Sequence, residues 1–394
     1  MISGKSGLKL VNILFVVPSY RPAYGYGGTI VVTALLAENL VKLGHTVTVF
    51  TTTANGRTEL NVKTKREHVV DGVVVRYFRR VTGDHTHTSP SLWRHLRNTI
   101  DHFDVVHIHS WWNPLVIGAA WICKTYEVKP ILSSHGMFSD YILATRNSRL
   151  KQLTQKVVGL SLLRNTFLHV STDMELEEAR RIIPDWPATV IPNLVELPEL
   201  TYERKANDVF TIGFLSRIDP KKGLDILIGA LGKVDFSYRL LVAGDGDTNY
   251  IDSLKQMAID NGTSENIEWI GWKNGDEKFD FMAGLDLFAL ISHSENFAIV
   301  VIESLSVGTP VLISDQVGLN KYVRNNDVGW ICERDLLGVA SKLKEIYVDK
   351  QKLVRITGMS ESLIKNDFDA IELTHRYVRY YEKVVDNQGK PGFA

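Results

Sequence analysis

The feature that most constrains the fold is an alternation of short β-branched runs with segments of helical periodicity, which occurs twice along the chain. Continuous apolar runs separated by helices are typical of parallel strands that are covered on both faces. The expected strands of the first series are 11–17, 46–51, 73–77, 105–109, 130–133 and 167–171, with a helix at 29–43. Those of the second series are 211–215, 239–243, 267–270, 287–291, 311–314 and 329–331. The sequence therefore predicts an α/β protein with two doubly wound parallel sheets.

Two domains are also expected from length, because 394 residues exceed the roughly 250 to 300 at which single cores stop growing. Residues 191–208 contain two prolines and show weak periodicity, so they are interpreted as an interdomain linker. A helical stretch at 370–385 closes the chain. Ligands of such sheets bind at the carboxyl ends of the strands, and the default site is therefore a cleft between the domains.

The charge is balanced overall, with 45 Lys and Arg against 45 Asp and Glu, but residues 1–170 hold 20 bases against 9 acids. A basic half attracts anionic membranes, phosphorylated substrates or nucleic acid. The segment 146–164 combines such bases with leucines at helical spacing, which fits docking on an anionic bilayer. A solvated helix whose apolar face packs inward is the simpler alternative. Its bases are Arg146, Arg149, Lys151, Lys156 and Arg164.

Cysteine usage and hydropathy predict a cytoplasmic location. Cys123 and Cys332 lie in different halves and in apolar surroundings, so no disulfide is expected and a reducing compartment is favoured. The apolar run at 11–17 is too short for a signal sequence. No stretch approaches the roughly 20 apolar residues of a membrane span, so membrane contact is expected to be peripheral, at the inner face.

The densest functional signal lies at 292–318, where Glu295 and Glu303 are separated by seven residues. If a helix begins near Phe297, its free N–H groups can receive a phosphate and Glu303 lies on the inner face. A sugar nucleotide would fill both positions. The alternative is that Glu295 caps the helix and that Glu303 is an exposed helical glutamate.

A second signal is Arg217 and, after a turn, Lys221, Lys222 and Gly223 at the start of a helix. A guanidinium fork and an ammonium group at a strand-to-helix turn suit a diphosphate, although two lysines in a solvated loop are the simpler alternative.

A third signal is the glycine loop Gly25, Gly27 and Gly28, between the first strand and the first helix, where the backbone can approach a ligand. Its spacing is not GxGxxG and no acid ends the second strand, which argues against a nicotinamide enzyme.

Histidines follow two predicted strands. His107, His109 and His135 are candidates to hydrogen-bond a substrate or to move a proton, and one of the first two is expected to face the core. Metal-ligand spacing does not accompany them. Asp245 and Asp247 form a D-x-D pattern, which we interpret as part of a strand-to-helix turn rather than as a metal site.

Taken in order, the motifs resemble family 4 of the retaining glycosyltransferases, enzymes of the GT-B fold. They are Gly27–Gly28, GHTVTVFT, DVVHIHS, SSHG, VSTDMELE, VIPN, SRIDPKKGLD, VAGDGD and the segment with both glutamates that ends in GTPVLIS. The resemblance implies two Rossmann-like domains, 1–195 on the acceptor side and 207–370 on the donor side, with residues 371–394 as a helix that returns to the first domain.

The resemblance also implies roles for individual residues. Arg217 and Lys222 would hold the donor diphosphate, Glu303 the ribose, and Glu295 with the backbone of 296–299 the transferred sugar and distal phosphate. His135 would contact the sugar near the reacting carbon. The implied catalytic residues are therefore His135, Glu295, Arg217 and Lys222. The implied donor-binding set is Gly27, Gly28, Arg217, Lys222, Gly244, Asp245, Trp272, Glu295, Asn296, Phe297, Ala298, Ile299 and Glu303.

Many family members have E-G-F-G where this chain has Glu295, Asn296, Phe297 and Ala298, which puts the identity of the sugar in doubt. The implied activity is metal-independent, retaining transfer from a UDP- or GDP-sugar to a glycan or lipid-linked glycan in surface polysaccharide biosynthesis. No cofactor and no nucleic-acid partner is expected. The alternatives are a nucleotide-sugar epimerase, hydrolase or phosphorylase of the same fold, or a non-catalytic sugar-nucleotide binding partner.

Overall fold

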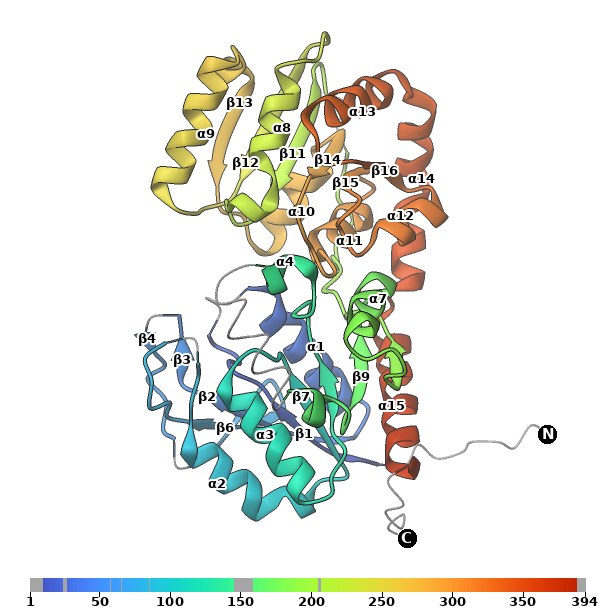
Figure 1. Cartoon of the computed structure of the whole chain (residues 1–394). Helices are drawn as coiled ribbons and strands as arrows, with labels where there is room; N and C mark the ends of the chain where they lie inside the picture. Colours follow the sequence, from blue (N-terminus) through green and yellow to red (C-terminus); the bar gives the residue numbers. More distant parts are fainter. Residues whose placement is uncertain are drawn as a thin grey trace, which may run out of the picture. The chain divides into compact units, whose positions relative to one another are not determined.

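A computed structural model describes residues 10–23, 27–56, 58–64, 66–84, 86–144, 159–204 and 207–387. The chain divides into two compact units (Figure 1). Unit 1 comprises residues 1–194 together with 370–394, and unit 2 comprises residues 195–369.

Unit 1 is built on an eight-stranded sheet of order β10-β9-β8-β7-β1-β2-β6-β5. Its strands are β1 (Asn12–Val16), β2 (Thr46–Thr52), β5 (Glu67–Val70), β6 (Val73–Phe78), β7 (Val105–His109), β8 (Ile131–Ser133), β9 (Phe167–Val170) and β10 (Ala188–Val190). Neighbouring strands are parallel, as predicted, except that β5 runs antiparallel to β6. The strand β5 was not among those expected; Asp71 and Gly72 both have positive φ (51° and 83°) and turn the chain back as a tight hairpin. A separate two-stranded ribbon pairs β3 (Ala54–Asn55) with β4 (Thr58–Glu59).

Helices cover the sheet of unit 1 because its central strands are apolar on both faces; every residue of β7 is buried. The helices are α1 (Gly28–Lys42), α2 (Pro90–Thr99), η2 (Ile100–His102), α3 (Pro114–Thr125), α4 (Asp140–Ala144), α6 (Leu160–Leu163), α7 (Asp173–Ile182) and α15 (Ala370–Asn387). Most of the predicted basic segment 146–164, including Arg146, Arg149, Lys151 and Lys156, lies outside the described residues.

The last helix, α15, belongs to unit 1 and confirms the expected return of the chain (Figure 1). Its tyrosines are buried against the central strands. The Tyr381 hydroxyl lies 2.9 Å from Nδ1 of His107 on β7, and the Tyr377 hydroxyl lies 2.9 Å from Nε2 of His169 on β9. The helix therefore completes the core of unit 1 from the far end of the sequence.

Unit 2 contains a six-stranded sheet of order β13-β12-β11-β14-β15-β16, in which all neighbours are parallel. Its strands are β11 (Phe210–Leu215), β12 (Tyr238–Ala243), β13 (Ile267–Gly271), β14 (Leu287–Leu290), β15 (Val311–Ser314) and β16 (Gly329–Cys332). Its helices are η4 (Pro220–Lys222), α8 (Leu224–Leu231), α9 (Thr248–Asp260), η5 (Ser264–Asn266), α10 (Gly275–Ala283), α11 (Ile299–Ser306), α12 (Asn320–Asn326), α13 (Leu336–Val348) and α14 (Lys350–Asp367). The fold class predicted from the sequence is thus confirmed.

Strand order determines where a ligand can approach each sheet. In unit 2 the order reverses between β11 and β14, and in unit 1 it reverses between β1 and β7. The loops that leave such neighbours turn to opposite sides of the sheet and leave a crevice at the carboxyl ends of the strands. The candidate site is therefore expected at these two edges.

Candidate functional site

The loops that follow β11 and β14 meet at the reversal point of unit 2. The Lys222 ammonium group forms an ion pair with the Glu295 carboxylate, and both side chains are largely buried. The backbone N–H of His293 donates to the carbonyl of Lys221 at 2.8 Å. The structure therefore brings together the two segments that the sequence singled out separately.

Gly223 allows this close approach. Its φ is 66°, and a Cβ atom built on it would lie 1.9 Å from the carbonyl oxygen of Ile291, at the end of β14. A side chain here would force the two loops apart and would be strained in this conformation. The glycine thus places Lys222 beside Glu295.

Arg217 and Lys221 add positive charge to this edge. The Arg217 side chain is exposed and makes no hydrogen bond or ion pair with any residue that the structure describes. Burial lowers the pKa of Lys221. An exposed guanidinium next to two lysines is suited to a diphosphate.

The helix α11 begins at Ile299, two residues later than predicted. Ala298 is its N-cap residue and has φ 59° and ψ 70°, a left-handed conformation that interrupts the helix before that point. No side chain caps the helix, so backbone N–H groups of its first turn are open to an anion. Phe297 packs its ring against Phe368, 6.1 Å between centroids, and can contribute to a ligand only through its backbone.

Glu295 is anchored through its backbone. Its N–H donates to the carbonyl of Gln316 at 3.0 Å, and its own carbonyl accepts from the N–H of Gly318 at 2.8 Å. Because Ala298 is the N-cap residue, the alternative that Glu295 caps the helix is wrong.

Glu303 is buried, with 6% of its surface exposed, so the alternative of an exposed helical glutamate is also wrong. Its Oε1 accepts from Nζ of Lys278 on α10 at 2.6 Å. Burial raises the pKa of Glu303, and the lysine opposes this shift. Lys278 was missed by the sequence reasoning, which had no signal for packing between α10 and α11.

The glycines after β12 allow the neighbouring loops to approach each other closely. A Cβ atom on Gly244 would lie 2.1 Å from the Ser216 carbonyl oxygen, and one on Gly246 would lie 2.0 Å from that of Ile218. The side chain of Asp245 accepts from the N–H of Gly246 at 2.8 Å, and Asp247 caps α9 by accepting from the N–H of Tyr250. The D-x-D pattern thus forms a strand-to-helix turn.

Trp272 lies one residue beyond β13, is 46% exposed, and donates through Nε1 to the Asn274 side chain at 2.6 Å. The carbonyl of Gly271 accepts from the N–H of Gly244 at 3.0 Å. The predicted base-side residues Gly244 and Trp272 are therefore close along the same edge of the sheet. Within the described ranges, no group of three or more His, Cys, Asp or Glu side chains is arranged to hold a metal ion.

In unit 1, the glycine loop ends at the N-terminus of α1. Gly27 is the N-cap residue, with φ 78°, and Gly28 is the first helical residue. The helix has no side-chain cap. Gly25 of the same loop lies outside the described residues.

The three candidate histidines of unit 1 form one cluster. The rings of His107 and His109 stack at 4.2 Å between centroids, and both residues are buried. The expectation that only one of them faces the core is wrong, because residues two apart on a strand lie on the same face and both faces of β7 are covered. Nδ1 of His109 lies 3.1 Å from Nε2 of His135. Burial lowers the pKa of all three imidazoles, so they are neutral at neutral pH.

His135 itself follows β8 in a left-handed conformation, φ 52°. The buried carboxylate of Glu175 on α7 bonds the residues on either side of it, Ser134 and Gly136. Glu175 lies in the motif VSTDMELE, and no individual role for it was predicted from the sequence.

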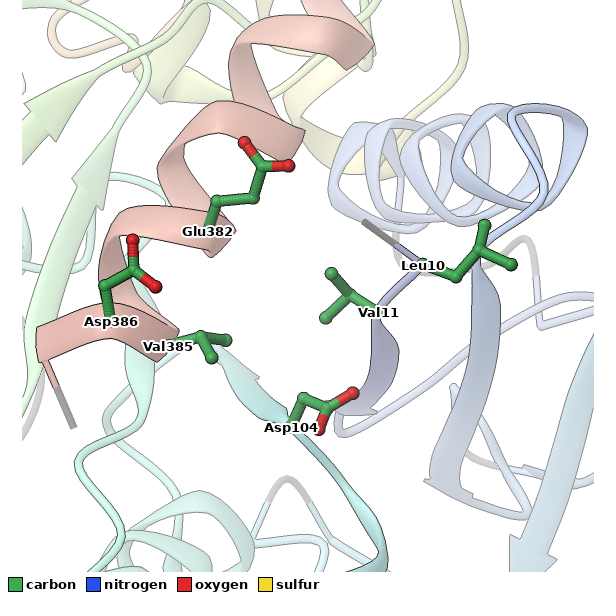
Figure 2. A pocket seen from close by; sticks show the side chains of 6 residues that line it. All are labelled: Leu10, Val11, Asp104, Glu382, Val385 and Asp386. Carbon is green, nitrogen blue, oxygen red and sulfur yellow. The ribbon is translucent and has the colours of Figure 1, made fainter. Parts of the chain in front are cut away.

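Two hollows among the described residues lie away from the candidate site residues. A cavity of about 160 Å³ in unit 1 lies at the amino ends of β1 and β7, opposite the carboxyl end of β7 where His109 stands, and is lined by Leu10, Val11, Asp104, Glu382, Val385 and Asp386 (Figure 2). Three carboxylates would repel a diphosphate. A second hollow, which includes Asn207, Tyr238 and Asn266, lies at the amino ends of the unit 2 strands.

Comparison with known proteins shows the same architecture elsewhere. Sucrose-phosphate synthase from Thermosynechococcus elongatus superposes with a TM-score of 0.75 at 16% identity, over 95% of this chain and 100% of that one. Anabaena HepE, solved with UDP and glucose, gives a TM-score of 0.71 at 17% identity, over 95% and 100% of the two chains. These likenesses establish the fold.

Sequence relatives carry glycosyltransferase names. An uncharacterized glycosyltransferase of Methanocaldococcus jannaschii is 24% identical over 367 residues, 86% of this chain and 90% of that protein. The lipopolysaccharide core biosynthesis glycosyltransferase of Rhizobium meliloti is 26% identical over 270 residues, 66% of this chain and 74% of that protein.

Two family descriptions match successive parts of the chain. Glycosyltransferase Family 4 matches residues 26–198, and Glycosyl transferases group 1 matches residues 202–357. The first match lies almost wholly in unit 1 and the second lies in unit 2. The chain therefore belongs to the family 4 glycosyltransferases of the GT-B fold.

Proposed function

We propose that this glycosyltransferase moves a sugar from a UDP- or GDP-sugar to a glycan or lipid-linked glycan, with retention at the anomeric carbon, in surface polysaccharide assembly. The observation that carries the proposal is the group formed at the reversal point of the unit 2 sheet by exposed Arg217, the Lys222–Glu295 pair and the uncapped start of α11. HepE was solved with UDP-glucose, and a relative acts in lipopolysaccharide core biosynthesis, which supports both halves of the proposal.

The diphosphate is assigned to the cationic part of this group. Arg217 offers two parallel N–H donors, Lys222 offers a point charge, and the first turn of α11 offers backbone N–H groups. Negative charge develops on the departing nucleotide as the glycosidic bond breaks. Fixed positive groups stabilise that charge, so Arg217 and Lys222 lower the barrier. Because these groups supply the positive charge, the proposed transfer needs no metal ion.

The two glutamates are assigned to different parts of the donor. Glu303 is held by Lys278 and is assigned to the ribose hydroxyls, to which a carboxylate oxygen accepts hydrogen bonds. Glu295, next to Lys222, is assigned to hydroxyls of the transferred sugar. Gly244, Asp245 and Trp272 are assigned to the base.

The proposed contacts from unit 1 are His135 and the loop of Gly27 and Gly28. A neutral imidazole can accept or donate a hydrogen bond to a sugar hydroxyl without adding charge near the reacting carbon. The N-terminus of α1 presents backbone N–H groups beside the two glycines.

Titration calorimetry with UDP-glucose, UDP-galactose, UDP-N-acetylglucosamine and GDP-mannose tests the donor. We expect one nucleotide series to bind, and Lys222→Ala and Glu303→Ala each to weaken binding about tenfold or more, because a charge-assisted hydrogen bond is lost. Lys233→Ala, an exposed lysine just after α8, is the control. Wild-type affinity in both test variants would reject the assignment, and NMR of the anomeric proton of the product decides retention.

Peripheral membrane contact is a second part of the proposal. None of the described helices has the length and apolar character needed to cross a bilayer. Helices α2 and α3 of unit 1 contain Arg94, Arg97 and Lys124 and no acidic residue, and Trp121 on α3 is 67% exposed. We expect co-sedimentation with vesicles that contain anionic phosphatidylglycerol but not with neutral phosphatidylcholine vesicles. Equal sedimentation with both would remove the electrostatic part.

A further inference from the structure

Glu175 is a buried carboxylate, 1% exposed, whose two oxygens both accept hydrogen bonds. Oε1 accepts from the Ser134 hydroxyl and from the Gly136 N–H, each at 2.7 Å. Oε2 accepts from the N–H and the hydroxyl of Ser171 at 2.9 and 3.1 Å. Four donors from two separate segments thus compensate the burial of one charge.

The local sequence predicts a simpler role for this residue. Thr172 and Glu175 have the spacing of a capping box, and the Thr172 hydroxyl does accept from the N–H of Glu175 at 3.2 Å. In a capping box the glutamate reaches back to the N-cap residue of its own helix. Here its Oε1 instead bonds the loop after β8, 41 and 39 residues away in sequence. The carboxylate therefore makes tertiary contacts.

The two residues that Oε1 holds, Ser134 and Gly136, are the immediate neighbours of His135. His135 has φ 52°, and Gly136 after it has φ 76°. A non-glycine residue keeps such a conformation only where its surroundings hold it there. Bonds to both neighbours fix the direction in which the His135 side chain leaves the backbone.

We propose that Glu175 is a positioning residue for His135: its carboxylate clamps the loop after β8 and sets the imidazole at the orientation that the transfer needs. The inference rests on the proposed role of His135 at the donor sugar. Glu175 touches no substrate in this scheme and acts only through the loop.

The clamp is tested without any substrate. Glu175→Gln keeps the size of the side chain but turns one acceptor oxygen into a donor NH₂ group, so one pair of donors loses its acceptor whichever way the amide is turned. We expect amide hydrogen exchange to rise about tenfold or more in the peptide around Gly136 if the NH₂ group replaces Oε1, or in the peptide around Ser171 if it replaces Oε2. Glu177→Gln, the same change at an exposed position of α7, is the matched control and should leave both peptides unchanged. Unchanged exchange in both the Gly136 and the Ser171 peptides of Glu175→Gln would overturn the clamp.

The role through His135 is tested by a double-mutant cycle with the donor that the binding screen identifies. Glu175→Gln should lower kcat about tenfold or more with little change in KM, because the imidazole is displaced while the phosphate contacts of unit 2 remain. In a His135→Ala background the same change should lower kcat less than about twofold. An equal loss in both backgrounds would show that Glu175 does not act through His135.

Two further outcomes keep the tests separate. If no UDP- or GDP-sugar turns over with the wild-type protein, the proposed function fails while the exchange experiment still decides the clamp. If Glu175→Gln does not fold, Ser134→Ala removes one of the four donors without leaving a buried charge unpaired, and it should shift exchange and kcat in the same direction by a smaller factor.

Discussion

The carboxyl edges of the two sheets carry polar clusters of opposite character. In unit 1 the cluster consists of buried, neutral imidazoles bonded to hydroxyl groups, as where the Ser133 hydroxyl lies 2.7 Å from His107 and 2.6 Å from His169. In unit 2 the cluster consists of charged groups that remain partly accessible, such as Arg217 and the Lys222–Glu295 pair. Similar strand orders thus support one edge that carries buried neutral groups and another that carries accessible charged groups. Loss of a group should therefore affect stability in unit 1 and ligand binding in unit 2.

A fall in pH should produce the largest difference in stability between the two units. Burial lowers the pKa of His169 to about 4, against an ordinary value near 6.5, so the unfolded chain binds more protons between these values. The stability that depends on the neutral imidazole is complete above pH 6.5 and is lost as the pH falls toward 4, by about 3 kcal/mol for this residue alone.

Unit 2 provides the internal reference, because His293 is the only one of the 12 histidines in residues 195–369. Hydrogen exchange measured at pH 7 and pH 5, corrected for intrinsic rates, should show that β9 loses protection before β11. Loss of protection first in β11 would contradict the comparison.

Removal of the exposed guanidinium should affect catalysis and leave stability unchanged. Arg217→Ala should lower kcat about 10²-fold, because positive charge at the departing nucleotide is lost, and Arg217→Lys should recover only part of the rate. The melting temperature should stay within about 1 °C, since no described residue bonds this side chain. His107→Ala in unit 1 should instead lower the melting temperature, because this imidazole is buried and hydrogen-bonded. A large loss of stability in Arg217→Ala would break the distinction.

Gly223→Ala tests whether the charged edge depends on backbone geometry. The methyl group would meet the Ile291 carbonyl oxygen and force a left-handed alanine, so we expect a loss of at least about 2 kcal/mol in the free energy of unfolding. Gly358→Ala in α14, where a Cβ atom meets nothing within 4 Å, should instead gain about 0.5 to 1 kcal/mol. Urea unfolding measures both.

Ala298→Gly should have the smallest effect, a gain of about 1 kcal/mol in the stability of unit 2. The alanine stands at φ 59°, where glycine carries no steric penalty. Ala258→Gly inside α9 should lose about 0.5 to 1 kcal/mol, because there the backbone is helical. If both variants lose stability, the N-cap alanine is not strained.

Sequence periodicity was sufficient to locate most of the buried parallel strands, because these are short and largely apolar, but the parallel edge strand β10 was not among those expected. The predicted strands at 105–109 and 311–314 coincide with β7 and β15. The hairpin of β5 and β6 was missed although Asp71-Gly72 is a recognised turn signal, since β5 is half-exposed and has no apolar run. The start of α11 was misplaced because an alanine at position 298 gives no sequence signal for a positive φ.

Only those site residues that belong to recognisable sequence motifs could be predicted. The Lys222–Glu295 contact follows from two strand-end motifs that adjacent strands bring together. Lys278 and Glu175 could not be found in that way, because each acquires its role from helix packing against a distant loop. Such partners require tertiary structure.

The return of α15 has a consequence for synthesis of the protein. The hydroxyl groups of Tyr377 and Tyr381 lie against β9 and β7, yet 175 residues of unit 2 are translated between Leu194 and Ala370. At about 5 to 20 residues per second, a ribosome adds these in roughly 10 to 35 s. During that interval unit 2 emerges as a continuous segment that can fold by itself, while the sheet made first still lacks its final helix. The half of the protein that is translated first is therefore completed last.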